Sequence, residues 1–150
     1  MTSTLGWYPT RTPGGFILHL SATPEHLRAV RGLVEQTLTG AGADGDLTHA
    51  AKLVLSELCG NAVRACGDFV PLVAELEAEP GDGGRPEAVW VRLHDPQGGV
   101  RPRASAGRMD DPYAESGRGL ALVELLAPGW DTTLTPVGKQ IRCRVPLPGA

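Results

Sequence analysis

The sequence has few cysteines, no long apolar run and no large excess of charge, and each shortage excludes a class of protein. Its three cysteines are odd in number and show no C-x-x-C spacing, so neither a zinc site nor a disulfide framework is indicated. The net charge of −3 and the scattered Lys and Arg residues give no electrostatic reason to expect direct nucleic-acid binding. No stretch approaches the roughly 18 apolar residues of a membrane span, and the N-terminus has no basic segment followed by an apolar one. We therefore expect a soluble cytoplasmic protein with reduced thiols and no membrane contact.

The chain has the size and composition of one globular domain. Its 150 residues suffice for a full core but are few for two domains. Twenty Gly and thirteen Pro residues indicate long loops. Residues 1–15 show no periodicity, so we expect a flexible N-terminal arm there and the folded domain over residues 16–146.

Hydrophobic periodicity predicts an α+β protein. Strands are expected at residues 16–20, 69–77, 87–94, 130–135 and 139–145. Helices are expected over residues 24–40, from a cap at Asp46 or Thr48 to Cys66, and from Gly117 to Ala127. The 96–116 segment has no pattern, and a loop of this length is typical of a lid or a disordered segment. The order predicts a two-layer α/β sandwich with a mixed, mostly antiparallel sheet and helices on one face.

Two polar residues interrupt the apolar face of the second predicted helix. At about 100° per residue, five apolar residues of this helix fall within one arc of roughly 140°: Ala50, Leu53, Val54, Leu58 and Ala65. Glu57 and Asn61 lie in the middle of that arc, one turn apart. Burying a carboxylate costs several kcal/mol unless it is paired or the site is wet, so the pair favours a binding site. The alternative that this stretch leaves open is a helix whose C-terminal end is solvated, with the Glu57 carboxylate reaching into water.

Two further polar positions stand where a plain core would have none. Asp95 ends the clearest predicted strand, and Gly117-Arg118-Gly119 opens a predicted helix after the long loop. Taken singly, each also fits a structural role, because an Asp after a strand and a G-x-G turn are both common.

Together these segments resemble a known family. The motifs are S-E-L-C-G-N-A-V-R at residues 56–64, H-D-P at 94–96, G-R-G-L-A-L-V at 117–123 and G-K at 138–139. They resemble the GHKL (Bergerat-fold) ATP-binding domain of gyrase, histidine kinases and anti-sigma-factor kinases. The similarity spans residues 16–146 and is greatest to the small actinobacterial anti-sigma-factor serine/threonine kinases.

The resemblance implies a role for each polar position. Asn61 is expected to give an oxygen ligand to Mg²⁺ and to contact ATP, because Mg²⁺ prefers oxygen ligands. Glu57 is expected to act as the catalytic general base, and Asp95 to accept a hydrogen bond from the adenine amino group. A helix start suits phosphate, and the 96–116 loop is the expected ATP lid. The remaining nucleotide contacts implied are Gly99, Gly117, Arg118 and Gly119.

The resemblance predicts an ATP-binding regulatory serine/threonine kinase that phosphorylates a small antagonist protein and sequesters a sigma factor. A homodimer is a further expectation of the family. Two alternatives stay open: a non-catalytic, nucleotide-dependent binding switch, and an interaction domain that has lost its nucleotide. The second is favoured by the irregular stretch at 95–99, where Gln97 replaces a family glycine. Arg64 is interpreted as a helix-end charge and Lys139 as a lysine at a sheet edge.

Overall fold

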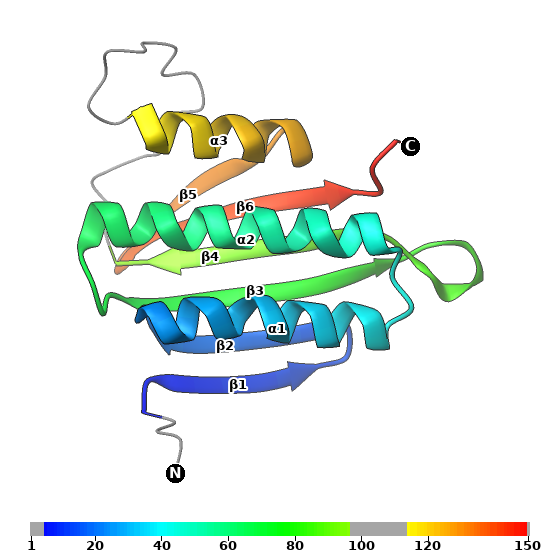
Figure 1. Cartoon of the computed structure of the whole chain (residues 1–150), viewed down its shortest axis with the longest axis horizontal. Helices are drawn as coiled ribbons and strands as arrows, with labels where there is room; N and C mark the ends of the chain where they lie inside the picture. Colours follow the sequence, from blue (N-terminus) through cyan, green and yellow to red (C-terminus); the bar gives the residue numbers. More distant parts are fainter. Residues whose placement is uncertain (1–4, 97–113, 150) are drawn as a thin grey trace.

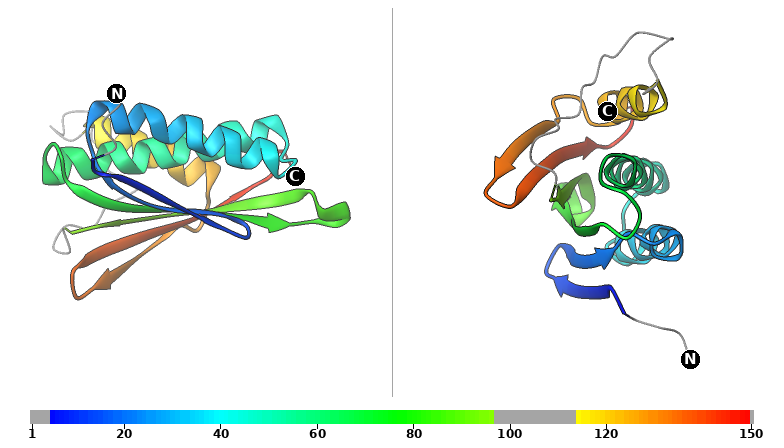
Figure 2. Two further views of the ribbon diagram at one scale, coloured as in Figure 1. Left: turned by 90° about the horizontal axis from the view of Figure 1, so that it is seen from below. Right: turned by 90° about the vertical axis from the view of Figure 1, so that its left-hand side faces the viewer.

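In the part of the chain that the structure describes, three helices lie side by side on one face of a six-stranded sheet (Figures 1 and 2). The computed structural model describes residues 5–96 and 114–149, with the backbone alone for 114–119. The expected α+β sandwich is thereby confirmed. The strand order is β1-β2-β3-β4-β6-β5, and every described pair is antiparallel, so the parallel pairing expected of a mixed sheet is not found in the described strands. The elements are β1 Trp7–Thr12, β2 Gly15–Ser21, α1 Pro24–Gly40, α2 Gly45–Cys66, β3 Pro71–Pro80, the 3₁₀ turn Asp82–Gly84, β4 Pro86–Asp95, α3 Ala114–Leu126, β5 Asp131–Thr135 and β6 Gly138–Pro146.

The first two helices begin at side-chain caps. The Thr23 hydroxyl accepts a hydrogen bond of 3.0 Å from the backbone N–H of His26, and Pro24 takes the first helical position, as predicted. Helix α2 starts earlier than predicted, because Asp44 is its cap and accepts from the backbone N–H of Asp46 at 2.8 Å. None of the helices within the described residues is long and apolar enough to cross a membrane.

The core lies between the helices and the sheet. Alternate residues of each central strand point toward the helices, as the period-two pattern predicts. Leu58 of α2 and Leu93 of β4 are fully buried in this layer. Truncating such a leucine to alanine typically costs about 2–5 kcal/mol, so this layer supplies much of the stability. The buried sheet residues include Phe16, Leu18, Leu20, Leu72, Ala74, Leu76, Val89, Val91, Leu93, Ile141, Cys143 and Val145.

The predicted flexible arm contains a strand, and this part of the prediction is wrong. Residues 7–12 form β1, which pairs with β2 in an antiparallel hairpin. Trp7 packs toward the helices, with its ring centroid 5.4 Å from that of His26. The strand escapes sequence analysis because it is an edge strand with few apolar residues and a Pro, which only edges tolerate. Gly15 is needed at the turn, since a Cβ there would lie 1.9 Å from the Leu76 carbonyl oxygen.

Candidate functional site

The polar segments singled out in the sequence meet at one end of the sandwich. Figure 1 shows the C-terminal half of α2, the start of α3, the end of β4 and the start of β6 at the same end. Helix α2 lies between α1 and α3. Ser56 faces α1, because its hydroxyl accepts from Arg31 Nε at 3.2 Å. The next residue is about 100° further round the helix, so Glu57 and Asn61 lie on the side of α2 away from α1, toward α3.

Glu57 and Asn61 lie at the margin of the buried face of α2, not in its middle. Both are half-buried, and Ala65, predicted to belong to the apolar arc, is exposed. The buried residues of α2 are Leu47, Thr48, Ala50, Ala51, Val54, Leu55, Leu58, Cys59 and Ala62. The sequence pattern did not give the centre of the buried face accurately, because apolar residues continue beyond the expected arc, with Leu55 and Cys59 among them. At this margin neither polar side chain bears the full cost of burial.

Asn61 is only partly satisfied in the structure. Its Oδ1 accepts a short hydrogen bond from Arg64 Nη2, while its Nδ2 is buried and finds no partner among the described residues. A buried donor left without an acceptor typically costs about 1–3 kcal/mol, so this nitrogen calls for an acceptor from a water or a ligand. Arg64 was expected to be only a helix-end charge, whereas it folds back onto Asn61 one turn earlier.

Asp95 is buried and paired with a lysine. Its side chain is 1% exposed, and its Oδ2 lies 3.4 Å from the Nζ of Lys139, which is itself only 5% exposed. The two residues face each other across the β4–β6 pairing. Lys139 was interpreted as a sheet-edge residue, and this is wrong, because β6 lies between β4 and β5 in the sheet. The period-two pattern of β6 could have shown this, because Lys139 is two residues from Ile141 and lies on the same buried face.

A close backbone contact holds this pair in place. Gly138 has φ +153°, and a Cβ on it would lie 1.9 Å from the Asp95 carbonyl oxygen, so only glycine fits there. The end of α2 lies near the same charges. Burial raises the pKa of the Cys66 thiol, the negative charge of Asp95 raises it further, and Lys139 opposes that rise.

The glycine segment lies inside α3 and not at its first position. The helix starts at Ala114, so Gly117, Arg118 and Gly119 follow its first turn. The unpaired amides of a helix N-terminus therefore belong to residues 114–116 in this structure. Gly99 and residues 97–113 of the expected lid lie outside the described residues.

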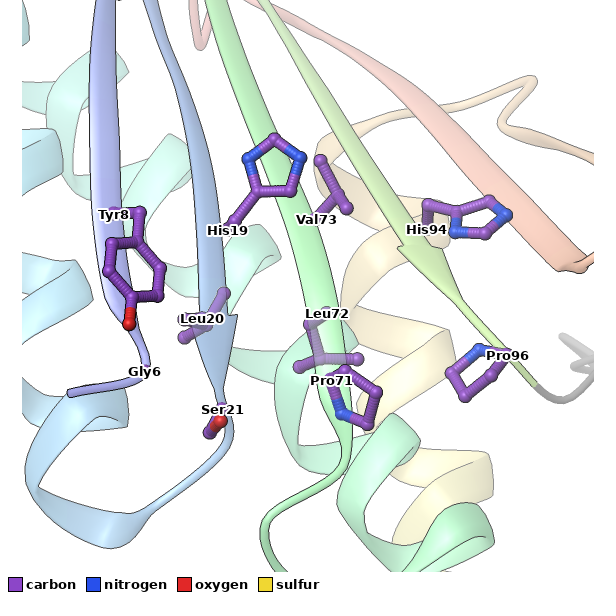
Figure 3. Close-up of a pocket in the computed structure, with 10 residues that line it drawn as sticks. All are labelled: Gly6, Tyr8, His19, Leu20, Ser21, Pro71, Leu72, Val73, His94 and Pro96. Carbon is purple, nitrogen blue, oxygen red and sulfur yellow. The ribbon is translucent and has the colours of Figure 1, made fainter.

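A separate hollow of about 340 Å³ lies on the open face of the sheet (Figure 3). Tyr8, His19 and His94 are among the residues that line it, and His19, Val73 and His94 follow one another across three strands. His94 and Asp95 are consecutive in β4 and point to opposite faces. The hollow is therefore separated by the sheet from Asn61 and Asp95.

The donor set at the α2–α3 end suits magnesium bound with a nucleotide. No group of three or more His, Cys, Asp or Glu residues that could hold a metal occurs in the described part of the chain. Mg²⁺ bound to a nucleotide typically takes only one or two protein oxygens, because phosphates and waters supply the others. The amide oxygen of Asn61 is an oxygen ligand of this kind, provided that Arg64 releases it.

Comparison with known proteins identifies the family. The family model described as the histidine kinase-like ATPase domain matches residues 20–145. The chain therefore belongs to the histidine kinase-like ATPase domain family.

Among solved structures, the chain is similar to the histidine kinase domain of the blue-light activated histidine kinase EL346 from Erythrobacter litoralis. The identity is 19% and the TM-score 0.43, over 82% of this chain and 60% of that one. The chain thus spans less than two thirds of that domain. No curated protein matches the chain.

Proposed function

We propose that this chain binds Mg²⁺-ATP between α2 and the start of α3, and that it is a serine/threonine kinase of the anti-sigma-factor type. Family membership supports an ATP-binding, kinase-type regulator. The protein would transfer the γ-phosphoryl group of ATP to a small antagonist protein and hold a sigma factor when the antagonist is not phosphorylated. The sigma factor, the antagonist and the cytoplasmic location come from the sequence resemblance.

The observation that carries the nucleotide site is the amide nitrogen of Asn61. Its Nδ2 is buried without an acceptor within the described residues, and it lies on the side of α2 that faces α3. A phosphate oxygen would supply the acceptor. Asp95, which is expected to contact the base, is buried at the end of β4, where it pairs with Lys139.

Each residue then has a distinct task. The Oδ1 of Asn61 would hold Mg²⁺, the first-turn amides of α3 would face the phosphates, and the Asp95 carboxylate would accept from the adenine amino group. Bound Mg²⁺ would neutralise charge that develops on the phosphates. Gly117, Arg118 and Gly119 would line the phosphate end from α3, with Gly99 as a further contact from the adjoining segment.

Glu57 is suited to accept a proton from the attacking hydroxyl. In the transfer, the serine or threonine oxygen bonds to the γ-phosphorus while the bond to the bridging oxygen of ADP breaks. The hydroxyl proton passes to the Glu57 carboxylate, and ADP leaves. Glu57 is half-buried one turn before Asn61, so it is held near the metal end of the proposed site while a protein substrate can still reach it.

The metal role of Asn61 is tested by calorimetric titration of ATP with and without Mg²⁺. We expect Asn61→Ala to remove Mg²⁺-dependent binding with little loss of stability, because the residue is only half-buried. Ser56→Ala is the matched control, since it lies on the same helix but faces α1. Affinity in Mg²⁺ that is equal in Asn61→Ala and the parent would contradict this role.

The catalytic role of Glu57 is tested by phosphate transfer from labelled ATP to purified candidate antagonists. We expect Glu57→Gln to keep the ATP affinity and to slow transfer about a hundredfold or more, the usual contribution of a general base. Transfer near the parent rate would show that Glu57 is structural.

A second candidate is an interaction domain that no longer uses nucleotide. Two contacts favour it: Lys139 already pairs with Asp95, and Arg64 already bonds to Asn61. Both groups expected to hold ATP therefore have partners from the chain itself. The titration of ATP decides between the candidates, because this domain would bind no nucleotide with or without Mg²⁺.

A further inference from the structure

A cleft of about 630 Å³ lies at the end of the sandwich opposite to the proposed nucleotide site. It is lined by the β1–β2 hairpin, the C-terminal half of α1 and the turn between β3 and β4, and Figure 1 shows these segments together at that end. Binding sites for small molecules typically measure about 300–1,000 Å³. The cleft therefore has the size of a ligand site.

The cleft lies where α1 stops short of the edge of the sheet. Helix α1 packs on β2, whereas β1 lies one strand further out. Pro13 and Gly14 join the two strands of the hairpin, and α1 ends at Gly40, so these segments add no large side chain to the space between them. Pro9 and Pro13 fix the backbone φ angle, which holds this wall of the cleft in shape before a ligand binds.

The lining combines apolar and polar groups. Phe16 is buried and Leu33 is half-buried, and both line the cleft. Thr12, Gln36 and Thr37 add hydroxyl and amide groups that can donate hydrogen bonds. Such a lining suits a ligand with an apolar body and a polar end.

Arg11 gives the cleft its charge. Among the described residues it is the only charged one in the lining, and it forms no ion pair with any of them. Arg11 lies directly opposite Phe16 in the β1–β2 pairing, so the two side chains share the helix-facing side of the sheet. A guanidinium group donates two parallel hydrogen bonds to a carboxylate or a phosphate. Since no acid lines the cleft within the described residues, its charge is complementary to an anion.

We propose that the cleft between β1 and α1 binds a small organic anion. The carboxylate or phosphate ester of the ligand accepts hydrogen bonds from Arg11, and its apolar body packs against Phe16 and Leu33. Thr12 and Thr37 supply further donors. This site is separate from the nucleotide site, so the inference goes beyond the proposed function and does not depend on it.

The test is a titration followed by the backbone amide signals in NMR spectra, without nucleotide. The probes share one ring system: 2-naphthoate and 2-naphthyl phosphate carry the two oxyanions, and 2-naphthalenemethanol is uncharged. We expect the better of the two anions to shift the signals of cleft residues with a Kd of about 0.1–1 mM, as the size of these probes allows. The alcohol should bind at least about fivefold more weakly, because it lacks the charge. The affinities of the two anions show which oxyanion the cleft prefers.

Replacing Arg11 isolates the charge from the apolar lining. Arg11→Met should weaken binding of that anion by about fivefold to tenfold, the effect of one charge-assisted contact, and leave binding of the alcohol unchanged. Arg28→Met is the matched control, since Arg28 is an exposed arginine of α1 that does not line the cleft. This variant should bind the anion as the parent does.

Four results would overturn the inference. Neither anion shifts the cleft signals in a saturable way at millimolar concentration, or saturable shifts occur only at other residues. The alcohol binds the parent as tightly as the anions do. Arg11→Met binds the anion with the affinity of the parent. Finally, Arg28→Met weakens binding as much as Arg11→Met, which would show an effect of net charge alone.

Discussion

Breaking the Asp95–Lys139 pair should destabilise the fold far more than breaking an exposed pair on the same strand. At 3.4 Å and an effective dielectric constant of about 20, the attraction between two unit charges is about 5 kcal/mol. Much of this offsets the cost of burying both groups, so the pair as a whole adds little. Removing one partner is different, because the remaining charge stays buried. We expect Asp95→Asn and Lys139→Met each to lower the free energy of unfolding by about 3–5 kcal/mol.

The assay is urea unfolding without nucleotide, so its outcome does not depend on the proposed function. The double variant Asp95→Asn/Lys139→Met leaves no buried charge of this pair, and it should be more stable than either single variant. Arg142→Met is the control, because its pair with Asp131 is about half exposed and such pairs contribute little. The reasoning is refuted if Asp95→Asn loses no more stability than Arg142→Met. It is also refuted if the losses of the two single variants simply add in the double variant.

Further predictions concern the hairpin and the core thiols. Gly15→Ala should destabilise the protein, because the added Cβ would overlap the Leu76 carbonyl oxygen. Gly32 is exposed in α1, and a Cβ added there would meet no atom within 4 Å beyond its own stretch of helix. Gly32→Ala should therefore stabilise the protein by about 0.5–1 kcal/mol. Thermal unfolding of both variants checks this, and a stable Gly15→Ala would contradict the observed hairpin. Burial raises the pKa of Cys59 and Cys143 from 9.0 to about 12. Only the unfolded chain then ionises these thiols between pH 9 and 12, so the free energy of unfolding should fall as the pH rises through that range. Urea unfolding at stepwise pH tests this, and a Cys59→Ala/Cys143→Ala variant with the same alkaline loss would speak against it.

The central elements could be predicted because their residues follow one period each. The alternation of β4 and β6 and the helical spacing of α1 indicate which side chains are buried, and the structure buries them. The start of α1 could also be predicted, because Thr23 and Pro24 affect only the backbone of the few residues that follow them. The α+β sandwich followed from the order of these elements.

Other features depend on partners far along the chain and were misplaced. Strand β1 has little apolar pattern of its own and is held by hydrogen bonds to β2 and by the contact of Trp7 with His26. Lys139 was wrongly placed at an edge of the sheet, because local periodicity does not reveal the order of the strands.

The sequence by itself determined which polar residues lie in or beside the buried layer: Glu57 and Asn61 on a helix and Asp95 at a strand end. It did so because an amphipathic pattern is local, and a polar residue within it is visible without knowledge of the fold. Only the tertiary structure decided what these residues touch. Lys139 meets Asp95 because β6 pairs with β4, although 44 positions of sequence numbering separate them. The Arg64 side chain donates to Asn61, three residues earlier on α2. Such contacts arise from strand pairing and side-chain conformation, which are settled only when the whole chain packs.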